Sequence, residues 1–329
     1  MMAKQRILSG MRPSGKLHLG NYLGALKNWV QLQQDYECYY FIADWHALTT
    51  GFADTTQVQE WVREIAIDYL SAGLHPEESI LFIQSRVPEH AELHLLLSMI
   101  TPLPWLERIP TYKEQQQELK ERDLGTYGFL GYPLLQTADI IMYKAHWVPV
   151  GIDQVSHIEF SREVVRRFHH LYQVEIFPEP QLKLTEVPKL SGLDGRKMSK
   201  SYDNVIYLSD STEDLTQKVK TMMTDPARQR RTDPGDPAIC PVFDLHRIYS
   251  TADERQEVAQ GCRTAGIGCI DCKGVLIRNL LTDLQPLHQT RAYYTAHPDE
   301  AMQILTAGSE RARHVAQETM AQVREAVNL

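Results

Sequence analysis

Short apolar runs alternate with longer helical segments over the first 84 residues, and this alternation limits the fold more than any other feature. Three runs have the length and apolarity of buried strands: Arg6–Ser9, Cys38–Ala43 and Ile80–Gln84. Between them, Gly20–Gln34 and Thr55–Ala72 repeat apolar side chains at the spacing of a helix that packs against a core. This strand–helix–strand order predicts a parallel sheet with helices on both of its faces.

The alternation continues once more and then stops. A helix that starts at a proline is expected over Tyr132–Tyr143, a strand over Trp147–Val150 and a long helix over Asp153–Tyr172. Further on, the strand signals fade and helical patterns dominate from Ser211, whose spacing to Asp214 is that of a helix N-terminal cap.

These patterns together predict three parts of the chain. Residues 1–205 are expected to form a Rossmann-like parallel α/β domain, and residues 206–308 an all-helical domain. A final helix is expected within residues 309–329, where Ala312 and Val315 begin an apolar stripe. Because an apolar stripe needs a partner, this helix is expected to pack back on the first domain.

The composition is that of an ordinary globular protein, with 43% apolar and 23% charged residues. No apolar run approaches the roughly 18 residues that span a bilayer, and the first residues lack the apolar stretch of a signal peptide. We therefore expect a cytoplasmic protein that does not enter a membrane. The net charge of −8 argues against a chain coated in basic surface, although a local basic stripe could still bind nucleic-acid phosphates.

A loop rich in glycine and proline, Pro13–Asn21, separates the first expected strand from the first expected helix. In open α/β sheets ligands bind at this end of the strands, and the start of a helix favours a negative phosphate group. Glycines allow the backbone to approach a nucleotide closely, and His18 could donate a hydrogen bond to phosphate oxygens. Taken alone, a histidine at this place is more often a helix cap or a surface residue.

A second candidate loop, Lys197–Ser201, has the sequence Lys-Met-Ser-Lys-Ser and follows a flexible stretch at Gly192–Gly195. Two lysines on a mobile loop can close over a polyphosphate and neutralise the charge that develops on a leaving pyrophosphate. Together with the His-Leu-Gly-Asn sequence of His18–Asn21, this loop indicates an ATP site built from two segments that are far apart in the chain.

The expected helix at Tyr132–Tyr143 carries three polar side chains roughly on one face, namely Tyr132, Gln136 and Asp139. Asp139 lies among leucines and isoleucines, so its carboxylate should be partly buried and needs a hydrogen-bond donor. An indole N–H or a phenol O–H of a substrate would supply that donor, and a local cap or ion pair is the other interpretation. A substrate that lacks a donor, such as phenylalanine, should be rejected.

At the two loops the chain resembles the class I aminoacyl-tRNA synthetases. His18–Asn21 is similar to their HIGH signature and Lys197–Ser201 to their KMSKS signature, and the short chain with an early first signature resembles the subgroup for tryptophan and tyrosine. The resemblance implies that an amino-acid carboxylate attacks the α-phosphate of ATP, with Mg²⁺ assisting, to give an aminoacyl-adenylate and pyrophosphate. The terminal ribose of a tRNA then takes the aminoacyl group, without a covalent enzyme intermediate.

Several segments are similar to tryptophanyl-tRNA synthetases: Gly10–Leu26, Ala43–Thr49, Phe82–Ala91 and Val148–Glu159. The resemblance implies catalytic roles for His18, Asn21, Lys197 and Lys200. It implies ATP binding by Arg12, Pro13, Ser14, Gly20, Asn21, Gly151, Ile152, Asp153, Leu190, Lys197, Met198, Ser199, Lys200 and Ser201. It implies that Asp139 reads the indole nitrogen of tryptophan in a pocket completed by Tyr132, Gln136, His46 and Gln154.

Two departures from this resemblance concern the amino acid and the first loop. Gln136 stands where many bacterial tryptophan enzymes have methionine, and its spacing to Tyr132 and Asp139 also resembles tyrosyl enzymes. Arg12 stands where glutamine is common before the Pro-Ser pair. A tyrosine–tRNA ligase is therefore the nearest alternative to a tryptophan–tRNA ligase.

Four of the five cysteines fall in the last third of the chain, at Cys240, Cys262, Cys269 and Cys272. The last two form a C-x-x-C pair, which can chelate one metal centre from a tight turn, and four thiolates suit zinc or a 4Fe–4S cluster. Spacing alone does not choose between these metals. Four reduced cysteines without metal are the other interpretation.

The cysteine spacing is similar to that of a subset of tryptophanyl-tRNA synthetases, and the resemblance implies a 4Fe–4S cluster in the anticodon-binding domain. That domain would be residues 206–308, with a tRNA as its partner. Arg228, Arg230 and Arg231 are then expected to face RNA, whereas taken alone they also suit a solvated polar loop.

The leading hypothesis is an ATP-dependent tryptophan–tRNA ligase, whose implied partners are L-tryptophan, tRNA(Trp) and a second copy of the chain in a homodimer. Two alternatives come from other classes. A small-molecule adenylyltransferase would use the same ATP site without tRNA, and the helical domain with its arginines argues against it. A non-catalytic binding protein would keep the fold, and the intact His18, Lys197 and Lys200 argue against that.

Overall fold

The computed structural model describes residues 4–118, 124–184 and 190–329, which form two compact units. The first unit contains the described residues of Met1–Gly15, Ala25–Glu186 and Tyr294–Leu329, and the second those of Lys16–Gly24 and Val187–Tyr293. Most of the first candidate loop and the whole of the second, which the sequence places within residues 1–205, therefore belong to the second unit.

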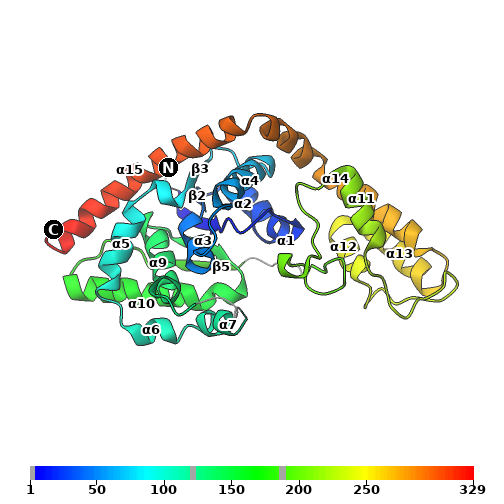
Figure 1. Ribbon diagram of the computed structural model, residues 1–329, viewed down its shortest axis with the longest axis horizontal. Coiled ribbons are helices and arrows are strands. Elements are labelled where there is room, and N and C mark those ends of the chain that lie inside the picture. Colours follow the sequence, from blue (N-terminus) through cyan, green and yellow to red (C-terminus); the bar gives the residue numbers. More distant parts are fainter. Residues whose placement is uncertain (1–3, 119–123, 185–189) are drawn as a thin grey trace. The chain divides into compact units, whose positions relative to one another are not determined.

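A five-stranded parallel sheet organises the first unit (Figure 1). Its order is β3-β2-β1-β4-β5, and every neighbouring pair is parallel. The strands are β1 Arg6–Met11, β2 Glu37–Ile42, β3 Ser79–Ile83, β4 Trp147–Val150 and β5 Gln181–Leu184. The predicted Rossmann-like fold class is confirmed. The order reverses at β1 and β4, so the loops that follow these two strands lie where open α/β sheets bind ligands.

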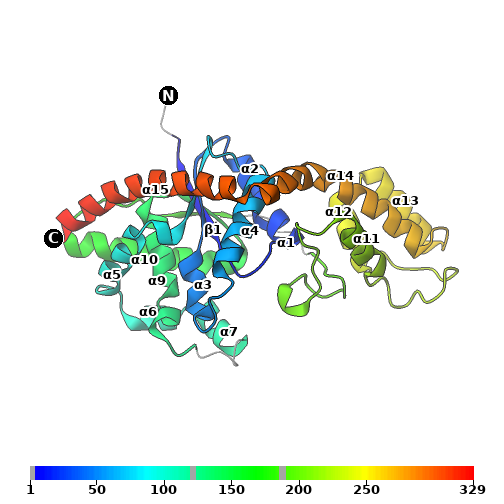
Figure 2. The same ribbon diagram turned by 45° about the horizontal axis from the view of Figure 1, so that its top comes forward.

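Helices cover both faces of this sheet (Figure 2). Successive residues of a strand point to opposite faces, and β2 shows the result. Its Tyr40 stacks on Trp29 with ring centroids 4.6 Å apart, whereas Tyr39 stacks on Tyr143 at 4.7 Å. The helices of this unit are α2 Lys27–Leu32, α3 Asp44–Gly51, α4 Val58–Ser71, α5 Glu89–Ser98, α6 Leu103–Glu107, α7 Pro110–Glu118, α8 Tyr127–Leu130, α9 Tyr132–Met142, α10 Val155–Tyr172 and α15 Pro298–Ala326.

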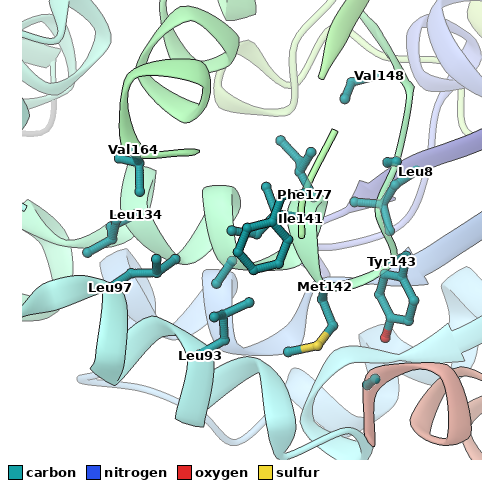
Figure 3. Close-up of a cluster of buried hydrophobic side chains, with 14 of the residues drawn as sticks. Leu8, Leu93, Leu97, Leu134, Ile141, Met142, Tyr143, Val148, Val164 and Phe177 are labelled. Carbon is teal, nitrogen blue, oxygen red and sulfur yellow. The ribbon is translucent and has the colours of Figure 1, made fainter. Parts of the chain in front are cut away.

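The main core lies between the sheet and helices α5, α9 and α10 (Figure 3). Helix α9 is apolar around most of its circumference, as expected for a helix enclosed by other elements. Its neighbours α5 and α10 contribute leucine, isoleucine, valine and phenylalanine side chains to the same cluster. The few polar groups of α9 are therefore buried with it and need partners of their own.

The predicted single helix over Gly20–Gln34 is wrong in its continuity. The chain forms a short helix α1 at Leu19–Asn21, a π-helical turn η1 at Tyr22–Leu26 and then α2. Gly24 lies in this turn and is a poor helix former, which makes a break easier here. The boundary between the two units falls directly after Gly24.

The second unit is built from helices: α1, α11 Thr212–Thr221, α12 Pro241–Tyr249, α13 Ala252–Arg263 and most of α14 Cys269–Ala296. Ser211 caps α11 as predicted, since its hydroxyl accepts a hydrogen bond from the Asp214 N–H at 3.0 Å. In the part of the chain that the structure describes, we find no helix with both the length and the apolarity to cross a membrane.

Helix α15 lies along β3, an edge strand of the sheet (Figures 1 and 2). The Ser309 hydroxyl accepts a hydrogen bond from the Ile83 N–H at 3.2 Å, so it satisfies a backbone group of that strand. Gly308 approaches the strand so closely that a Cβ atom would lie 1.8 Å from the Leu81 carbonyl oxygen. The helix therefore covers an edge that would otherwise be open to pairing.

Replacing Gly308 by alanine is expected to lower the free energy of unfolding by about 1–3 kcal/mol or more, because the added methyl group must push α15 away from β3. Urea unfolding measures the change. Gly51→Ala is the matched control, since a Cβ there meets nothing within 4 Å. Equal unfolding midpoints for the two variants would contradict the close contact at Gly308.

Candidate active site

His18 forms the N-terminal cap of α1, the short helix that follows the first loop. Its Nδ1 accepts a hydrogen bond from the Gly20 N–H at 3.0 Å, and its own N–H donates to the Asn21 side chain at 3.1 Å. Gly20 is required at this place because a Cβ would lie 2.8 Å from the His18 ring. The helix-cap interpretation of His18 is therefore correct, and it fixes the orientation of the ring.

His18 is neutral, and its role as the cap fixes which ring nitrogen carries the proton. Burial, followed by the positive charge of Lys200, lowers the pKa of His18 to about 4, so the ring is neutral at pH 7. Since Nδ1 accepts a hydrogen bond, the single ring proton must lie on Nε2. The side chain therefore carries an N–H donor on the nitrogen that the cap does not use.

The lysine loop, Lys197–Ser201, is held in shape by the buried side chain of Asn204. Asn204 Oδ1 accepts from the Ser199 N–H at 2.8 Å, and its Nδ2 donates to the Lys197 carbonyl at 3.1 Å. Gly192 leaves room for this amide, because a Cβ there would lie 2.2 Å from Asn204 Nδ2. Asn204 was not among the predicted site residues, since nothing in its local sequence separates it from an ordinary loop asparagine.

The structure brings His18 and the lysine loop together within the second unit. Residues 17–19 pair with residues 206–208 through two backbone hydrogen bonds of 3.0 Å each, and His18 lies opposite Tyr207. The pairing holds His18 near enough to Lys200 for the lysine charge to lower the histidine pKa. A neutral N–H donor and a cation are therefore available in the same neighbourhood, a combination that suits phosphate oxygens.

The other predicted ATP residues fall into two groups. Leu190 and Met198 join the base of the lysine loop, where the Met198 N–H donates to the Leu190 carbonyl at 2.9 Å. Those of the first unit follow β1 and β4, and they are Arg12, Pro13, Ser14, Gly151, Ile152 and Asp153. Because β1 and β4 are parallel neighbours, both stretches lie at the same edge of the sheet.

Asp139 on α9 is the most enclosed charged group of the first unit's candidate pocket, with 1% of its side chain exposed. Three side chains from other elements donate to it. His46 Nε2 lies 2.8 Å from Oδ2, His90 Nδ1 lies 2.6 Å from Oδ1, and Gln84 Nε2 lies 2.8 and 3.0 Å from the two oxygens. Burial alone would raise the pKa of Asp139, but the hydrogen bonds from His46 and His90 lower it to about 2. The carboxylate is therefore ionised at neutral pH.

Tyr132 stands at the start of the same helix, and Gln136 lies one turn further on. The Tyr132 hydroxyl lies 3.0 Å from Thr111 Oγ1, which also contacts His157 Nε2 at 2.6 Å. Burial raises the pKa of Tyr132, so it remains a phenol. Gln154 ends the 3₁₀ turn after β4 and is half-buried.

Gln84 and His90, both absent from the predicted site residues, are fully buried partners of Asp139. One sequence signal could have found Gln84, because it is a polar residue at the carboxyl end of an apolar strand, where ligand-binding residues gather. No comparable signal marks His90, which lies in α5 among residues of mixed polarity. Its contact with Asp139 depends on tertiary packing alone.

The four cysteines of the predicted metal site lie in the second unit, at the start of α12, near the end of α13 and in the first turn of α14. Burial, followed by negative charge on the other three thiols, raises the pKa of Cys272 to about 12, so all four lie within electrostatic reach of one another. Within residues 4–118, 124–184 and 190–329, however, no group of three or more His, Cys, Asp or Glu side chains has the arrangement of a metal site.

The expectation that Arg228 faces RNA is wrong. Only 8% of this residue is exposed, and its Nη2 donates to the carbonyls of Ile267 and Arg231 at 2.6 and 3.0 Å. Its Nη1 lies 3.8 Å from Cys262 Sγ. Arg228 therefore holds the turn between α13 and α14 against its own loop, whereas Arg230 and Arg231 are exposed.

Known proteins similar to this chain agree with the geometry. A relative named tryptophan–tRNA ligase from Thermotoga maritima is 52% identical over 98% of this chain and 99% of its own length. Another relative of the same name, from Ralstonia nicotianae, is 47% identical over 100% of this chain and 99% of its own length. The solved tryptophanyl-tRNA synthetase of Campylobacter jejuni, in complex with ADP and tryptophan, superposes with a TM-score of 0.90 at 32% identity, covering 99% of this chain and 100% of that one.

A tyrosyl-tRNA synthetase of Archaeoglobus fulgidus shares the fold, with a TM-score of 0.66 at 20% identity. A family model described as class I tRNA synthetases (W and Y) matches residues 2–285. With its parallel sheet, its paired His18 and lysine loops and these relatives, the chain belongs to the class I tRNA synthetases of the tryptophan and tyrosine group.

Proposed function

We propose that this chain is a tryptophan–tRNA ligase. It activates L-tryptophan with ATP to tryptophanyl-adenylate and pyrophosphate, and it then transfers the tryptophanyl group to tRNA(Trp) with release of AMP. The observation that carries this proposal is the pairing of residues 17–19 with residues 206–208, which holds neutral His18 near the cation of Lys200. The full-length relatives named tryptophan–tRNA ligase support the choice of amino acid.

Adenylate formation is a displacement at the α-phosphorus of ATP. A carboxylate oxygen of tryptophan forms a bond to this phosphorus, the bond to the β-phosphate oxygen breaks, and pyrophosphate leaves. The Nε2–H of His18 donates to a phosphate oxygen, while Lys197 and Lys200 offset the charge that develops on the leaving group. Mg²⁺ that accompanies ATP would supply further positive charge there. Asn21 is proposed to help position the nucleotide.

The tryptophan pocket is proposed around Asp139. Because this carboxylate is ionised, it accepts hydrogen bonds and does not donate them, which suits an indole N–H. Tyr132, Gln136, His46 and Gln154 line or support the same pocket. Phenylalanine would leave the buried acceptor without this donor, so the site rejects it. The hydroxyl of a bound tyrosine could also donate a hydrogen bond to Asp139. Tyrosine is therefore the amino acid that an activity assay must distinguish from tryptophan.

Amino-acid-dependent exchange of labelled pyrophosphate into ATP tests the proposal. We expect exchange with tryptophan, none above background with phenylalanine, and a far lower kcat/KM with tyrosine. Exchange that tyrosine supports and tryptophan does not would replace the proposal by a tyrosine–tRNA ligase. Charging of tRNA(Trp) with tryptophan separates the ligase from a small-molecule adenylyltransferase, which would form the adenylate and leave the tRNA uncharged.

We also propose that Cys240, Cys262, Cys269 and Cys272 bind a 4Fe–4S cluster, with zinc as the alternative. One observation fits a thiolate centre: the Arg228 guanidinium lies beside Cys262, with Nη1 3.8 Å from Sγ. Cationic neighbours favour the thiolate form that a metal requires. The cluster would brace the loops between α12, α13 and α14. Small movements of these loops are needed to reach ligand distances.

Anaerobic purification, an absorption spectrum and an iron and zinc assay test the cluster. We expect iron in the protein, the broad visible absorption of a thiolate-bound iron–sulfur cluster, and the loss of both in Cys262→Ser, with a lower unfolding temperature. The remaining cysteine, Cys38, lies in β2 of the first unit, so Cys38→Ser is the matched control. Zinc without iron would contradict the cluster, and unchanged stability of a metal-free Cys262→Ser protein would contradict both metals.

The remaining proposals concern partners. We assign the helical second unit to the anticodon region of tRNA(Trp), with the exposed Arg230 and Arg231 available to phosphates. We further propose a homodimer that covers the apolar side chains Leu95, Met99 and Leu103, which are 55%, 70% and 57% exposed. Sedimentation of wild type and of Met99→Asp tests it, since a charge in a dimer interface should shift the protein towards monomer.

A further inference from the structure

We infer that Gln84 and His90 are positioning residues of the tryptophan site. They orient the Asp139 carboxylate so that it presents an acceptor to the ring N–H of the substrate. The inference rests on the proposed function for the identity of that substrate. Everything else in it follows from the contacts around Asp139.

The donors around Asp139 engage both of its oxygens. An ionised carboxylate has about four acceptor positions on its two oxygens. Four contacts occupy them here: Gln84 reaches both oxygens, His90 contacts Oδ1 and His46 contacts Oδ2. The ring N–H of a substrate therefore reaches Asp139 by taking the place of one of these donors.

The three donors differ in their exposure, and this separates their roles. Gln84 and His90 are 0% exposed, so they contact Asp139 from inside the protein. The His46 side chain is 10% exposed, and it is the donor on the more open side. A ligand that reaches Asp139 therefore meets His46 first and leaves Gln84 and His90 in place. These two are the fixed part of the acceptor.

His90 is itself locked in orientation. Its Nδ1 faces Asp139, and its Nε2 lies 2.7 Å from the hydroxyl of Tyr143, the residue that ends α9. Burial raises the pKa of Tyr143 well above its ordinary value, so the hydroxyl remains a donor. Because the ionised Asp139 carboxylate can only accept, the His90 Nδ1 that faces it carries a proton. The contacts at both ring nitrogens hold the imidazole in this orientation.

Gln84 is fixed by the same carboxylate. Gln84 Nε2 lies 2.8 and 3.0 Å from the two Asp139 oxygens. If the amide were rotated by 180°, its oxygen Oε1 would take this place, and its negative partial charge would repel the carboxylate. The observed orientation is kept although Oε1 is buried and accepts no hydrogen bond among the described residues. The hydrogen bonds from Gln84 Nε2 to Asp139 therefore outweigh the cost of leaving Gln84 Oε1 without a donor. This orientation indicates that Gln84 serves to position Asp139.

The inference predicts a specific kinetic signature for Gln84→Leu and His90→Leu. Each variant loses a donor that offsets the burial of Asp139, so the pKa of Asp139 should rise. We expect KM for tryptophan to rise about tenfold at pH 8 with kcat changed less than about threefold, because ground-state binding is weakened. The ratio of mutant to wild-type KM should increase further as the pH is lowered from 8, because a raised pKa protonates a larger share of Asp139 at a given pH.

Other titrating groups also face Asp139. They are His46 on α3, His90 and His94 on α5, and Tyr143 at the end of α9. Taking the ratio to wild type removes the pH dependence that comes from groups shared by all the variants. Tyr143 does not titrate in this range, since its pKa is raised. A pH-dependent ratio therefore reports on Asp139 and its missing donor.

Three variants separate positioning from folding. His90→Asn keeps an N–H donor close to the place of Nδ1 and is expected to restore most of the tryptophan affinity that His90→Leu loses. Gln33→Leu is the matched control, because Gln33 is also buried, at 3% exposure, and bonds to Gly73, His75 and Ser79 away from Asp139. It should change stability and leave KM for tryptophan unaltered. Circular dichroism confirms that each protein is folded.

The outcomes are distinct. A KM within twofold of wild type and a flat ratio for both leucine variants would overturn the inference, as would an equal rise in KM for ATP. If one leucine variant fails to fold, the other decides, and the comparison of His90→Asn with wild type still reports the donor. Failure of the proposed function looks different, because wild-type protein would then exchange pyrophosphate with tyrosine and not with tryptophan.

Discussion

Replacing Lys200 by alanine is expected to slow tryptophanyl-adenylate formation by about 10²–10³-fold, the usual loss when one preorganised charge is removed from a developing anion. The change in KM for tryptophan should stay within about twofold, because the lysine acts on the transition state more than on bound tryptophan. Pyrophosphate exchange at saturating substrates measures the effect. Removing this charge should also let the pKa of His18 rise, since Lys200 is one of the two causes that lower it.

Lys220→Ala is the control for this prediction. Lys220 lies in the second unit, on α11, and its side chain is exposed. It should leave adenylate formation unchanged, so a similar loss in both variants would indicate a general effect of net charge. Full exchange activity in Lys200→Ala, or in the Lys197→Ala,Lys200→Ala double variant, would show that the lysine loop has been misassigned.

Replacing Asp139 by asparagine is expected to lower kcat/KM for tryptophan by about 10²-fold or more, because a buried acceptor is replaced by a group that also donates. The new amide nitrogen must face His46, Gln84 or His90, all of which donate to this position. Discrimination against phenylalanine should fall at the same time, since the site no longer contains a buried charge to which phenylalanine offers no donor. Exchange with each amino acid measures both changes.

Asp139 also contributes stability that depends on pH. Its pKa is about 2 in the folded protein against an ordinary value of 3.8, so folding favours the ionised form. This contribution is complete above the ordinary pKa, and it is lost as the pH falls from about 4 towards 2. Asp139→Asn should therefore lower the free energy of unfolding by about 3 kcal/mol at pH 7. The difference from wild type should shrink in acid.

The matched control is Asp54→Asn, an exposed aspartate of the same unit that bonds to Thr56. It should change neither tryptophan activation nor unfolding by more than a few tenths of a kcal/mol, as is usual for surface positions. An Asp139→Asn protein that keeps wild-type kcat/KM for tryptophan would mean that another group reads the indole.

The parallel sheet was predictable from sequence because β2 and β3 leave a strong signal. Both are nearly continuous apolar runs, as expected of strands covered on both faces. β5 was missed, since Gln181–Leu184 alternates polar and apolar residues and lies at the other edge, where one side is less enclosed. Helix α3 was missed because Asp44–Gly51 mixes polar and small residues without a clear apolar stripe.

The candidate site likewise contains residues that the sequence predicts and residues that it does not. The His18 and lysine loops were predictable as a pair because each concentrates glycine, histidine or lysine in a few consecutive positions. The residues that hold them were not, since Asn204 acts through a tertiary contact with no local pattern. The same holds for Gln84 and His90, whose burial beside Asp139 follows from the packing of β3 and α5 against α9. Sequence shows where chemistry is concentrated, and only packing shows what orients it.

The contact between α15 and β3 has a consequence for synthesis on the ribosome. Ile83 and the Ser309 that satisfies its N–H are 226 positions apart in the chain. At translation rates of about 5–20 residues per second, β3 is made roughly 10–45 seconds before its cover. During that interval the growing chain carries a finished strand with an open edge, the kind of surface that can pair with neighbouring nascent chains. Closure of this edge of the sheet therefore waits for residues that are made long after β3 itself.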